Sequence, residues 1–230
     1  MDQIPPLNRG IIQIAGFHDL EEATMAVDLG ADVLGIPLGL TVNDEDCDIS
    51  TARRIGDAFP ERTCLITYYE KAKEIAELAA TIHAAWIQIH GYISLKELRR
   101  LRAICPNKRI IKSLITGKFN LNELEEQAKD SSPFVDAFIT DSFNPKTGAE
   151  GATGLTHDWE ISRHLVNLNL RPILLAGGLN AQNVAEAIAK TQAFGVDSHT
   201  GVEDKTGRKC PNALNEFIEK SKTAFDHTEN

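Results

Sequence analysis

The chain has 230 residues, of which 42% are hydrophobic and 25% charged, and its formal net charge is -9 at pH 7. This length suits one α/β domain with a large buried core, or two small domains. The negative charge argues against nucleic acid or an anionic membrane as the main partner. No apolar run reaches the roughly 20 residues that a membrane helix needs, and the first residues carry no basic or apolar export segment. The four cysteines lack metal-ligand spacing, so we expect reduced thiols, no metal and a soluble cytoplasmic protein.

Short β-branched runs alternate with amphipathic segments along most of the chain. The predicted strands are Ile11–Ala15, Asp32–Ile36, Thr63–Thr67, Ala85–Ile89, Arg109–Leu114, Ala137–Thr140, Pro172–Leu175 and Gly195–Asp197. The predicted helices are Asp19–Leu29, Glu70–Ile82, Ser94–Ile104, Leu121–Ala128, Asn180–Lys190 and Asn212–Lys222. Several of them begin with residue types that cap helices, namely Asp19, Ser94, Asn180 and Asn212.

This alternation requires parallel strands joined by crossover helices. Eight strand–helix units predict an α/β fold of the (β/α)₈ TIM-barrel class, with an open doubly wound sheet as the alternative. We expect a single domain at residues 11–225, an N-terminal extension at 1–10 and a C-terminal tail at 226–230. Two long loops, Leu38–Ser50 and Ser142–His157, are expected to cover the active face.

Two glycine-bearing turns close to the C-terminus are the strongest functional signal. The first follows the strand at 172–175 and contains Gly177 and Gly178, and the second contains Ser198, His199, Thr200 and Gly201. Glycines there allow left-handed backbone angles and let backbone N–H groups reach a ligand. Two such turns after the last two strands of a barrel are typical of a phosphate site. The sequence therefore predicts a phosphorylated small molecule as ligand.

Five segments together resemble the phosphoribosylanthranilate isomerase family of the tryptophan pathway. They occur in the family's order and spacing and span most of the chain: Gly16–Ala23, Ile87–Gly91, Gly151–Trp159, Leu175–Asn180 and Gly195–Glu203. The resemblance implies an Amadori rearrangement, in which an acid protonates the furanose ring oxygen and a base removes the proton from the second carbon of the sugar. It also implies that Asp141, at the end of the sixth strand, is the acid. A carboxyl beside an apolar wall can have the raised pKa that this role needs.

The chain departs from the family at the base. The family has a cysteine in a Lys-Ile-Cys-Gly pattern on the first strand, where this chain has Gln13-Ile14-Ala15-Gly16. Alanine cannot accept a proton, so His18, just past this strand, is the predicted replacement. His199 stands where the family more often has serine, and it is predicted to contact phosphate. A role for His199 as base, or as a bulkier loop residue, also stays open.

The resemblance further implies that substrate contacts come from His90, Thr153, Gly154, Asp197 and Glu203. Family members carry a basic residue after the second strand that helps to hold the anthranilate carboxylate. This chain has no Lys or Arg between Arg9 and Arg53, and its second loop is acidic. Carboxylates at a pocket mouth repel a benzoate, so a neutral or cationic aglycone fits better, unless the loop faces away.

These observations predict an isomerase acting on a phosphorylated pentose or its N-glycoside, without a cofactor. The alternative is a catalytically silent barrel that binds a sugar phosphate as a sensor or partner protein. Lys112 on the fifth strand suggests Schiff-base chemistry, but pairing with a neighbouring group is the simpler interpretation. The expected partner is a phosphorylated small molecule rather than nucleic acid or membrane, and the expected state is a monomer or homodimer.

Overall fold

The computed structural model describes residues 7–40, 44–142 and 159–228. Eight parallel strands pair in chain order, and β1 pairs with β8 to close the barrel. The strands are β1 Ile11–Ala15, β2 Val33–Pro37, β3 Thr63–Thr67, β4 Trp86–Ile89, β5 Arg109–Thr116, β6 Ala137–Ser142, β7 Ile173–Leu175 and β8 Gly195–Ser198. The predicted TIM barrel is therefore confirmed, and every predicted strand is present.

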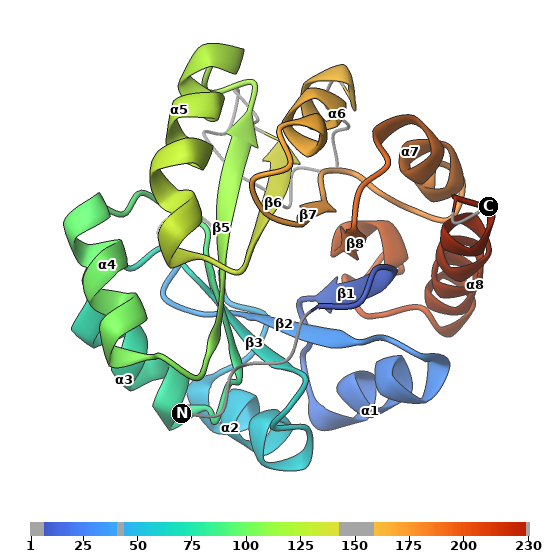
Figure 1. Cartoon of the computed structure of the whole chain (residues 1–230). Coiled ribbons are helices and arrows are strands. Elements are labelled where there is room, and N and C mark those ends of the chain that lie inside the picture. Colours follow the sequence, from blue (N-terminus) through green and yellow to red (C-terminus); the bar gives the residue numbers. More distant parts are fainter. Residues whose placement is uncertain (1–6, 41–43, 143–158, 229–230) are drawn as a thin grey trace.

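Helices surround the strands, as Figure 1 shows. They are α1 Leu20–Leu29, α2 Ile49–Ala58, α3 Ala72–Thr81, α4 Leu95–Ile104, α5 Leu121–Ser131, α6 Trp159–Asn167, α7 Val184–Thr191 and α8 Pro211–Thr228. Two short 3-10 helices lie at Ser132–Phe134 and Thr200–Val202. Within the described residues, no helix combines the length and apolar character needed to cross a bilayer.

Helix prediction failed in two places. The helix α2 begins inside the predicted loop Leu38–Ser50, with Asp48 as its N-cap, and α6 was not predicted. In α2, only Ala52, Ile55 and Gly56 are buried, so the helix lacks the stripe of large apolar residues by which helices are usually found in a sequence.

Two of the four predicted caps were also wrong. Asp19 and Ser94 cap α1 and α4 through their side chains. Asn180 instead forms a turn in which its side chain accepts from the Gln182 N–H at 2.8 Å, and α7 starts later, at Val184. Asn212 lies inside α8, which begins at Pro211.

Alternation along the strands produces two cores. Ile12 and Ile14 belong to the larger core that contains the buried faces of the helices, whereas Ile11 and Ala15 belong to the smaller core inside the barrel. Because successive side chains point to opposite faces of a strand, Gln13 also faces the interior. Polar residues at alternate positions near the strand ends therefore meet inside the barrel at its carboxyl end.

The glycine in α2 provides a test of how tightly the outer helices pack. A Cβ at Gly56 would lie 1.8 Å from the Ile82 carbonyl oxygen at the end of α3. Gly56→Ala should lower the free energy of unfolding by about 1 to 3 kcal/mol, because overpacking outweighs the roughly 1 kcal/mol that alanine gains in a helix. Chemical denaturation measures the change, with the exposed Arg54→Ala as control on the same helix. A more stable Gly56→Ala variant would contradict this packing.

Candidate active site

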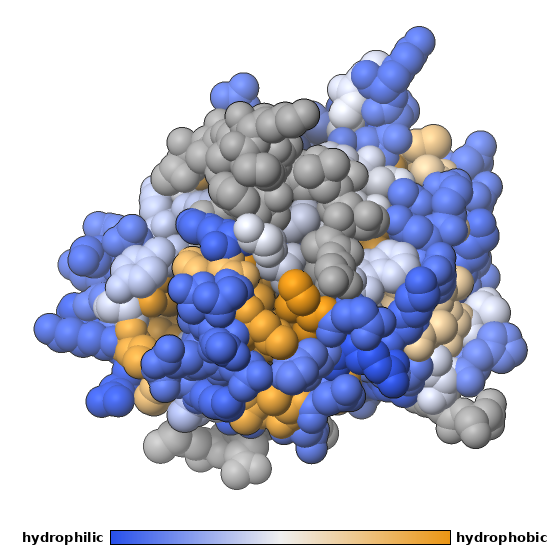
Figure 2. Space-filling model, turned by 90° about the horizontal axis from the view of Figure 1, so that it is seen from above, coloured by the Kyte–Doolittle hydropathy of each residue, from blue (hydrophilic) through white to orange (hydrophobic). Residues whose placement is uncertain are grey.

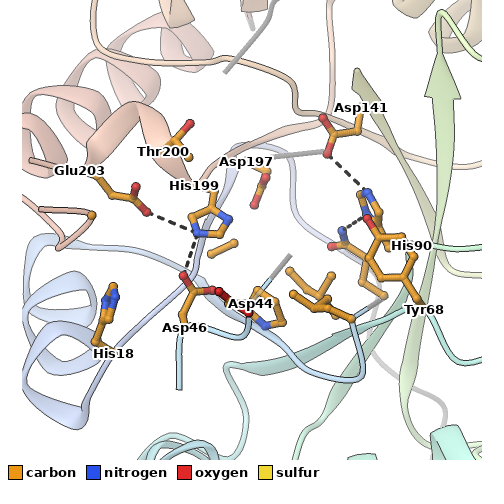
Figure 3. Close-up of a pocket in the computed structure, with 16 residues that line it drawn as sticks. His18, Asp44, Asp46, Tyr68, His90, Asp141, Asp197, His199, Thr200 and Glu203 are labelled. Atoms are coloured by element: carbon orange, nitrogen blue, oxygen red, sulfur yellow. Dashed lines mark hydrogen bonds and ion pairs between the residues drawn. The ribbon is translucent and has the colours of Figure 1, made fainter. Parts of the chain in front are cut away.

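A cavity of about 300 Å³ opens at the carboxyl ends of the strands. It is lined by Ala15, His18, Pro37, Leu40, Asp44, Asp46, Ile66, Tyr68, Gln88, His90, Asp141, Asp197, His199, Thr200, Glu203 and Gly207. Figure 3 shows how the labelled side chains converge on this space. Figure 2 views the molecule from the side of α5 and α6, which lie uppermost in Figure 1; hydrophobic side chains show near the middle of this view among mostly hydrophilic ones.

Amide side chains link opposite walls of the barrel beneath this cavity. The Gln13 Nε2 donates to Gln88 Oε1 at 2.8 Å and to Asp197 Oδ1 at 2.9 Å. Gln88 Nε2 lies 3.3 Å from His90 Nδ1, and Ser113 Oγ lies 3.0 Å from the same nitrogen. All of these residues are buried, so the network holds its side chains in fixed positions. It joins β1, β4, β5 and β8.

Asp141 is the penultimate residue of β6 and faces this network. Its side chain is 8% exposed, and its Oδ2 lies 3.8 Å from His90 Nε2. Burial raises the pKa of Asp141 to about 7, although a hydrogen bond from the Ser142 N–H opposes the shift; the charge of Asp197 adds to it. A carboxyl with this pKa is partly protonated near neutral pH and can donate a proton. The predicted acid therefore has the environment that its role requires.

Asp197 is the second buried carboxyl of the site. Burial raises its pKa to about 6, against the hydrogen bond from Gln13 and the charges of His199 and Lys209. The side chain that meets Asp197 from β1 is an uncharged amide, which supplies a hydrogen bond but no positive charge.

A smaller cavity adjoins the first at the two glycine turns. It is lined by Asp141, Gly177, Gly178, Leu179, Asp197, Ser198, His199, Thr200 and Gly201. Gly177 and Gly178 both have positive φ, at 89° and 62°, which few other residues adopt readily. Among the described residues, neither glycine N–H donates to an acceptor. The structure thus brings all six residues predicted for phosphate binding to one small, amide-lined space.

Gly201 and Ser198 hold the two turns against each other. A Cβ at Gly201 would lie 1.9 Å from the Leu179 carbonyl oxygen, so this approach requires glycine. Ser198 Oγ donates to the same oxygen at 2.8 Å. The Ser198 hydroxyl proton is therefore used within the protein, and Ser198 and Gly201 both shape the turn; their contact with phosphate stays a prediction.

His199 lies against carboxylates from two other parts of the chain. Its Nε2 is 3.3 Å from Asp46 Oδ1 and 3.3 Å from Glu203 Oε1. Lys209 Nζ, fully buried, contacts Glu203 Oε1 at 2.6 Å and donates to the His199 carbonyl oxygen at 3.2 Å. Burial alone raises the pKa of Asp46, but the hydrogen bond and charge of His199, with the charges of Lys209 and His18, hold it below its usual value.

The outer part of the large cavity is acidic, as the sequence predicted for the second loop. Asp44 and Asp46 line it together with Glu203, and none of the described residues that line it is Lys or Arg. Lys209 neutralises Glu203 from behind rather than facing the cavity. Asp44 is exposed, so its charge faces the solvent at the entrance.

His18 also lines the cavity, near its edge. Its Nδ1 is 3.3 Å from Glu22 Oε2, and its side chain is 34% exposed. Its role as base stays a prediction. Thr153 and Gly154 lie outside the described residues, as does most of the predicted loop Ser142–His157. Lys112 donates to the Gly91 and Ser113 carbonyl oxygens at 3.0 Å each, which favours a structural role over Schiff-base chemistry.

Four residues that shape the site were not predicted from the sequence. They are Gln88, Tyr68, Lys209 and, in its role as the partner of Asp197, Gln13. Gln13 and Gln88 are polar residues at inward positions of otherwise apolar strands, and that alternation is the signal that could have found them. The Tyr68 ring lies 5.1 Å from the ring of His90. Lys209 gives no such signal, because its loop has no periodic pattern.

The raised pKa of Asp141 predicts a specific effect on stability. A carboxyl has a pKa near 3.9 in an unfolded chain, so from about pH 4 to pH 7 the native state holds a proton that the unfolded state releases. The contribution of Asp141 to the free energy of unfolding is fully present below its pKa in the unfolded chain. It is lost as pH rises through its native pKa of about 7. Asp141→Asn keeps an acceptor for Ser142 and removes this loss. Its free energy of unfolding relative to wild type should rise by about 2 to 4 kcal/mol between pH 4 and pH 8.

Urea denaturation across this pH range measures the difference, with the exposed Asp28→Asn as control. Parallel curves for wild type and Asp141→Asn would show that Asp141 has an ordinary pKa.

Comparison with known proteins identifies the family. The family model for N-(5'-phosphoribosyl)anthranilate (PRA) isomerase matches residues 13–220. The chain is 34% identical over 218 residues to N-(5'-phosphoribosyl)anthranilate isomerase 2 of Methanosarcina mazei, covering 93% of this chain and 95% of that protein. It is 33% identical over 217 residues to the isomerase of Haloarcula marismortui, covering 93% and 96% of the two chains.

Solved structures agree with the fold. The phosphoribosylanthranilate isomerase of Thermotoga maritima superposes with a TM-score of 0.77 at 26% identity, covering 94% of this chain and all of that one (100%). A second isomerase structure, in complex with reduced 1-(o-carboxyphenylamino)-1-deoxyribulose 5-phosphate, has a TM-score of 0.73 at 25% identity and covers 94% and 100%. The protein described here belongs to the N-(5'-phosphoribosyl)anthranilate isomerase family.

Proposed function

We propose that this isomerase converts an N-(5-phosphoribosyl)amine into the corresponding 1-amino-1-deoxyribulose 5-phosphate. The observation that carries the proposal is the contact between two cavities. Asp141, Asp197, His199 and Thr200 line both the large cavity and the small one at the glycine turns. A phosphate bound at the turns would place the sugar beside Asp141 and leave the large cavity for the aglycone. The ligand of the related isomerase is a deoxyribulose 5-phosphate joined to an aromatic amine, which has these three parts.

The acid step follows from the environment of Asp141. Its protonated carboxyl would donate to the ring oxygen, so that the bond between this oxygen and C1 breaks and the amine nitrogen forms a double bond to C1. The pKa of about 7 makes a protonated carboxyl available near neutral pH.

The phosphate is held by backbone geometry. The turns present glycine N–H groups at positive φ, and Thr200 lines the same small cavity. The small cavity has a volume of about 20 Å³, close to the space that one water molecule needs, so a bound phosphate would fill it and reach into the large cavity beside it. We place the phosphate there and the ribose above Asp197.

The first candidate substrate is N-(5'-phosphoribosyl)anthranilate, for which the relatives are named. A second candidate is the glycoside of an aromatic amine without a carboxylate. It is favoured by Asp44, Asp46 and Glu203, whose carboxylates line the large cavity. A silent phosphosugar-binding barrel is less well supported, because the chain keeps both the acid and the phosphate turns. The cytoplasmic location of this protein and its state as a monomer or homodimer stay predictions.

Turnover by the purified protein tests the reaction directly. We expect wild type to convert N-(5'-phosphoribosyl)anthranilate, or its 2-aminobenzamide analogue, to the ketose. The fluorescence of the aromatic amine measures the rate of this conversion. Asp141→Asn should lower kcat by about 100- to 10,000-fold, because general-acid catalysis is lost while the site keeps its shape. Inorganic phosphate should inhibit wild type and Asp141→Asn with similar inhibition constants. Asp28→Asn serves as the matched control, and an active Asp141→Asn variant would contradict the assignment of the acid.

The charge of the aglycone provides a second test. The N-(5'-phosphoribosyl) derivative of 2-aminobenzamide has the shape of the anthranilate compound without its negative charge. We expect wild type to convert this amide compound with a kcat/KM several-fold higher than that for the anthranilate compound. Asp44→Asn should raise kcat/KM for the anthranilate compound by about fivefold, because one nearby exposed charge contributes about 1 kcal/mol. The same substitution should change kcat/KM for the amide compound little. Equal effects on both substrates would show that Asp44 does not select the aglycone.

A further inference from the structure

The end of β1 lacks a group that can accept a proton, yet a side chain from the neighbouring strand lies over it. The register pairs Ile14 with Ser198, so the next residues are neighbours: Ala15, the last residue of β1, and His199, which directly follows β8. A Cβ at Gly16 would lie 2.0 Å from His199 Nε2 and 2.5 Å from its Cδ2. The imidazole therefore rests directly on the backbone that follows Ala15. It occupies space beside the position of the family's cysteine.

Carboxylates fix the orientation of this ring. Asp46 and Glu203 both contact His199 Nε2, each at 3.3 Å. Carboxylates accept hydrogen bonds, so this arrangement favours the tautomer with its proton on Nε2 and its lone pair on Nδ1. Among the described residues, Nδ1 makes no hydrogen bond. In Figure 3, His199 has Asp46 and Glu203 on one side and Asp197 on the other.

The same carboxylates suit the product of proton transfer. When Nδ1 accepts a proton, the ring becomes an imidazolium, and Asp46 and Glu203 stabilise that charge. A base held by an acidic partner at its second nitrogen is the arrangement by which histidine acts in many hydrolases. Lys209, through its contacts with Glu203 and the His199 carbonyl oxygen, keeps the group in place.

We propose that His199 is the general base that removes the C2 proton of the sugar, in place of the cysteine that the family carries at position 15. The role rests on the proposed isomerase function. After Asp141 has opened the ring, Nδ1 takes the proton from C2. The electron pair of the C2–H bond forms a C1=C2 double bond, and the electrons of the C=N double bond return to nitrogen. The resulting enolamine becomes the ketose when C1 receives the proton from the imidazolium and the 2-hydroxyl gives its proton to the Asp141 carboxylate.

His18 is the competing candidate, and the structure favours it less. Its Nδ1 faces Glu22, and in the view of Figure 3 His199 lies between His18 and the pair of Asp141 and Asp197. Its side chain is 34% exposed, against 19% for His199, so water has more access to it. A buried, oriented imidazole is better suited to removing a carbon-bound proton.

Kinetics of His199→Ala and His199→Gln test the proposal on a substrate that wild type converts. We expect kcat to fall by about 100- to 10,000-fold, with KM and the inhibition constant of inorganic phosphate within about twofold of wild type. Circular dichroism and thermal unfolding check that each variant folds, and the exposed His227→Ala is the matched control. His18→Ala is measured in parallel.

Rescue separates a base from a structural residue. Adding Ala15→Cys to His199→Ala should restore kcat by at least about tenfold, because a thiol at the end of β1 would face the same cavity. Exogenous imidazole should also raise the rate of His199→Ala. A substrate deuterated at C2 should show a larger isotope effect with His199→Gln than with wild type, since proton removal then limits the rate.

Four results would overturn the proposal. If His199→Ala keeps kcat but raises KM and weakens phosphate inhibition, His199 is a phosphate contact. If His18→Ala loses turnover and the His199 variants do not, His18 is the base. If wild type converts no N-(5-phosphoribosyl)amine, the proposed function fails and this role fails with it; an active wild type with unaffected His199 variants refutes the base alone.

Discussion

The pairing of β1 with β8 is the contact on which the site depends. It closes the barrel, and it brings β1 next to a strand that begins 180 residues after β1 ends, at Gly195 as against Ala15. Ile11 lies opposite Gly195, and Ile14 lies opposite Ser198. In an open sheet these two strands would be edges with unpaired N–H and C=O groups. Closure satisfies those groups and directs the ends of both strands toward one cavity. Gln13 meets Asp197, and His199 covers Gly16, only because these strands are neighbours.

Burial of carboxyl groups then sets the chemistry. Asp141 and Asp197 both have raised pKa values, at about 7 and about 6, and burial is the largest cause for each. Relative to the family's Lys-Ile-Cys-Gly pattern, Gln13 replaces a cation with a neutral donor. Asp197 consequently contacts an amide group, which carries no charge. A positive charge at that position would have lowered the pKa of Asp197 and favoured its ionised form. Asp46, nearer the entrance, differs, because His199, Lys209 and His18 keep its pKa low.

The phosphate and reaction ends of the site have diverged to different degrees. The glycine turns rely on backbone angles and on the close approach of Gly201 to Leu179, which leave little freedom for substitution. Proton transfer instead requires only that some suitable group reach the sugar. Under the proposed role, His199, which directly follows β8, serves a position at the end of β1, because neighbouring strands share the same end of the barrel. Under this proposal, the protein keeps the two glycine turns while a different residue takes the proton.

The sequence by itself determined the strand order of the fold, the single barrel, a carboxyl near the end of β6 and the two glycine turns. These features are local: strand periodicity, strand–helix alternation and glycine spacing follow from neighbouring residues. It did not determine α2, whose buried face is small, or the start of α7, because Asn180 forms a turn rather than a cap. Only the tertiary structure decided that His199 contacts Asp46, which lies 153 residues away, and that Gln13 connects Gln88 to Asp197. These contacts arise from the closure of the barrel, and no local pattern along the chain encodes which side chains that closure brings together.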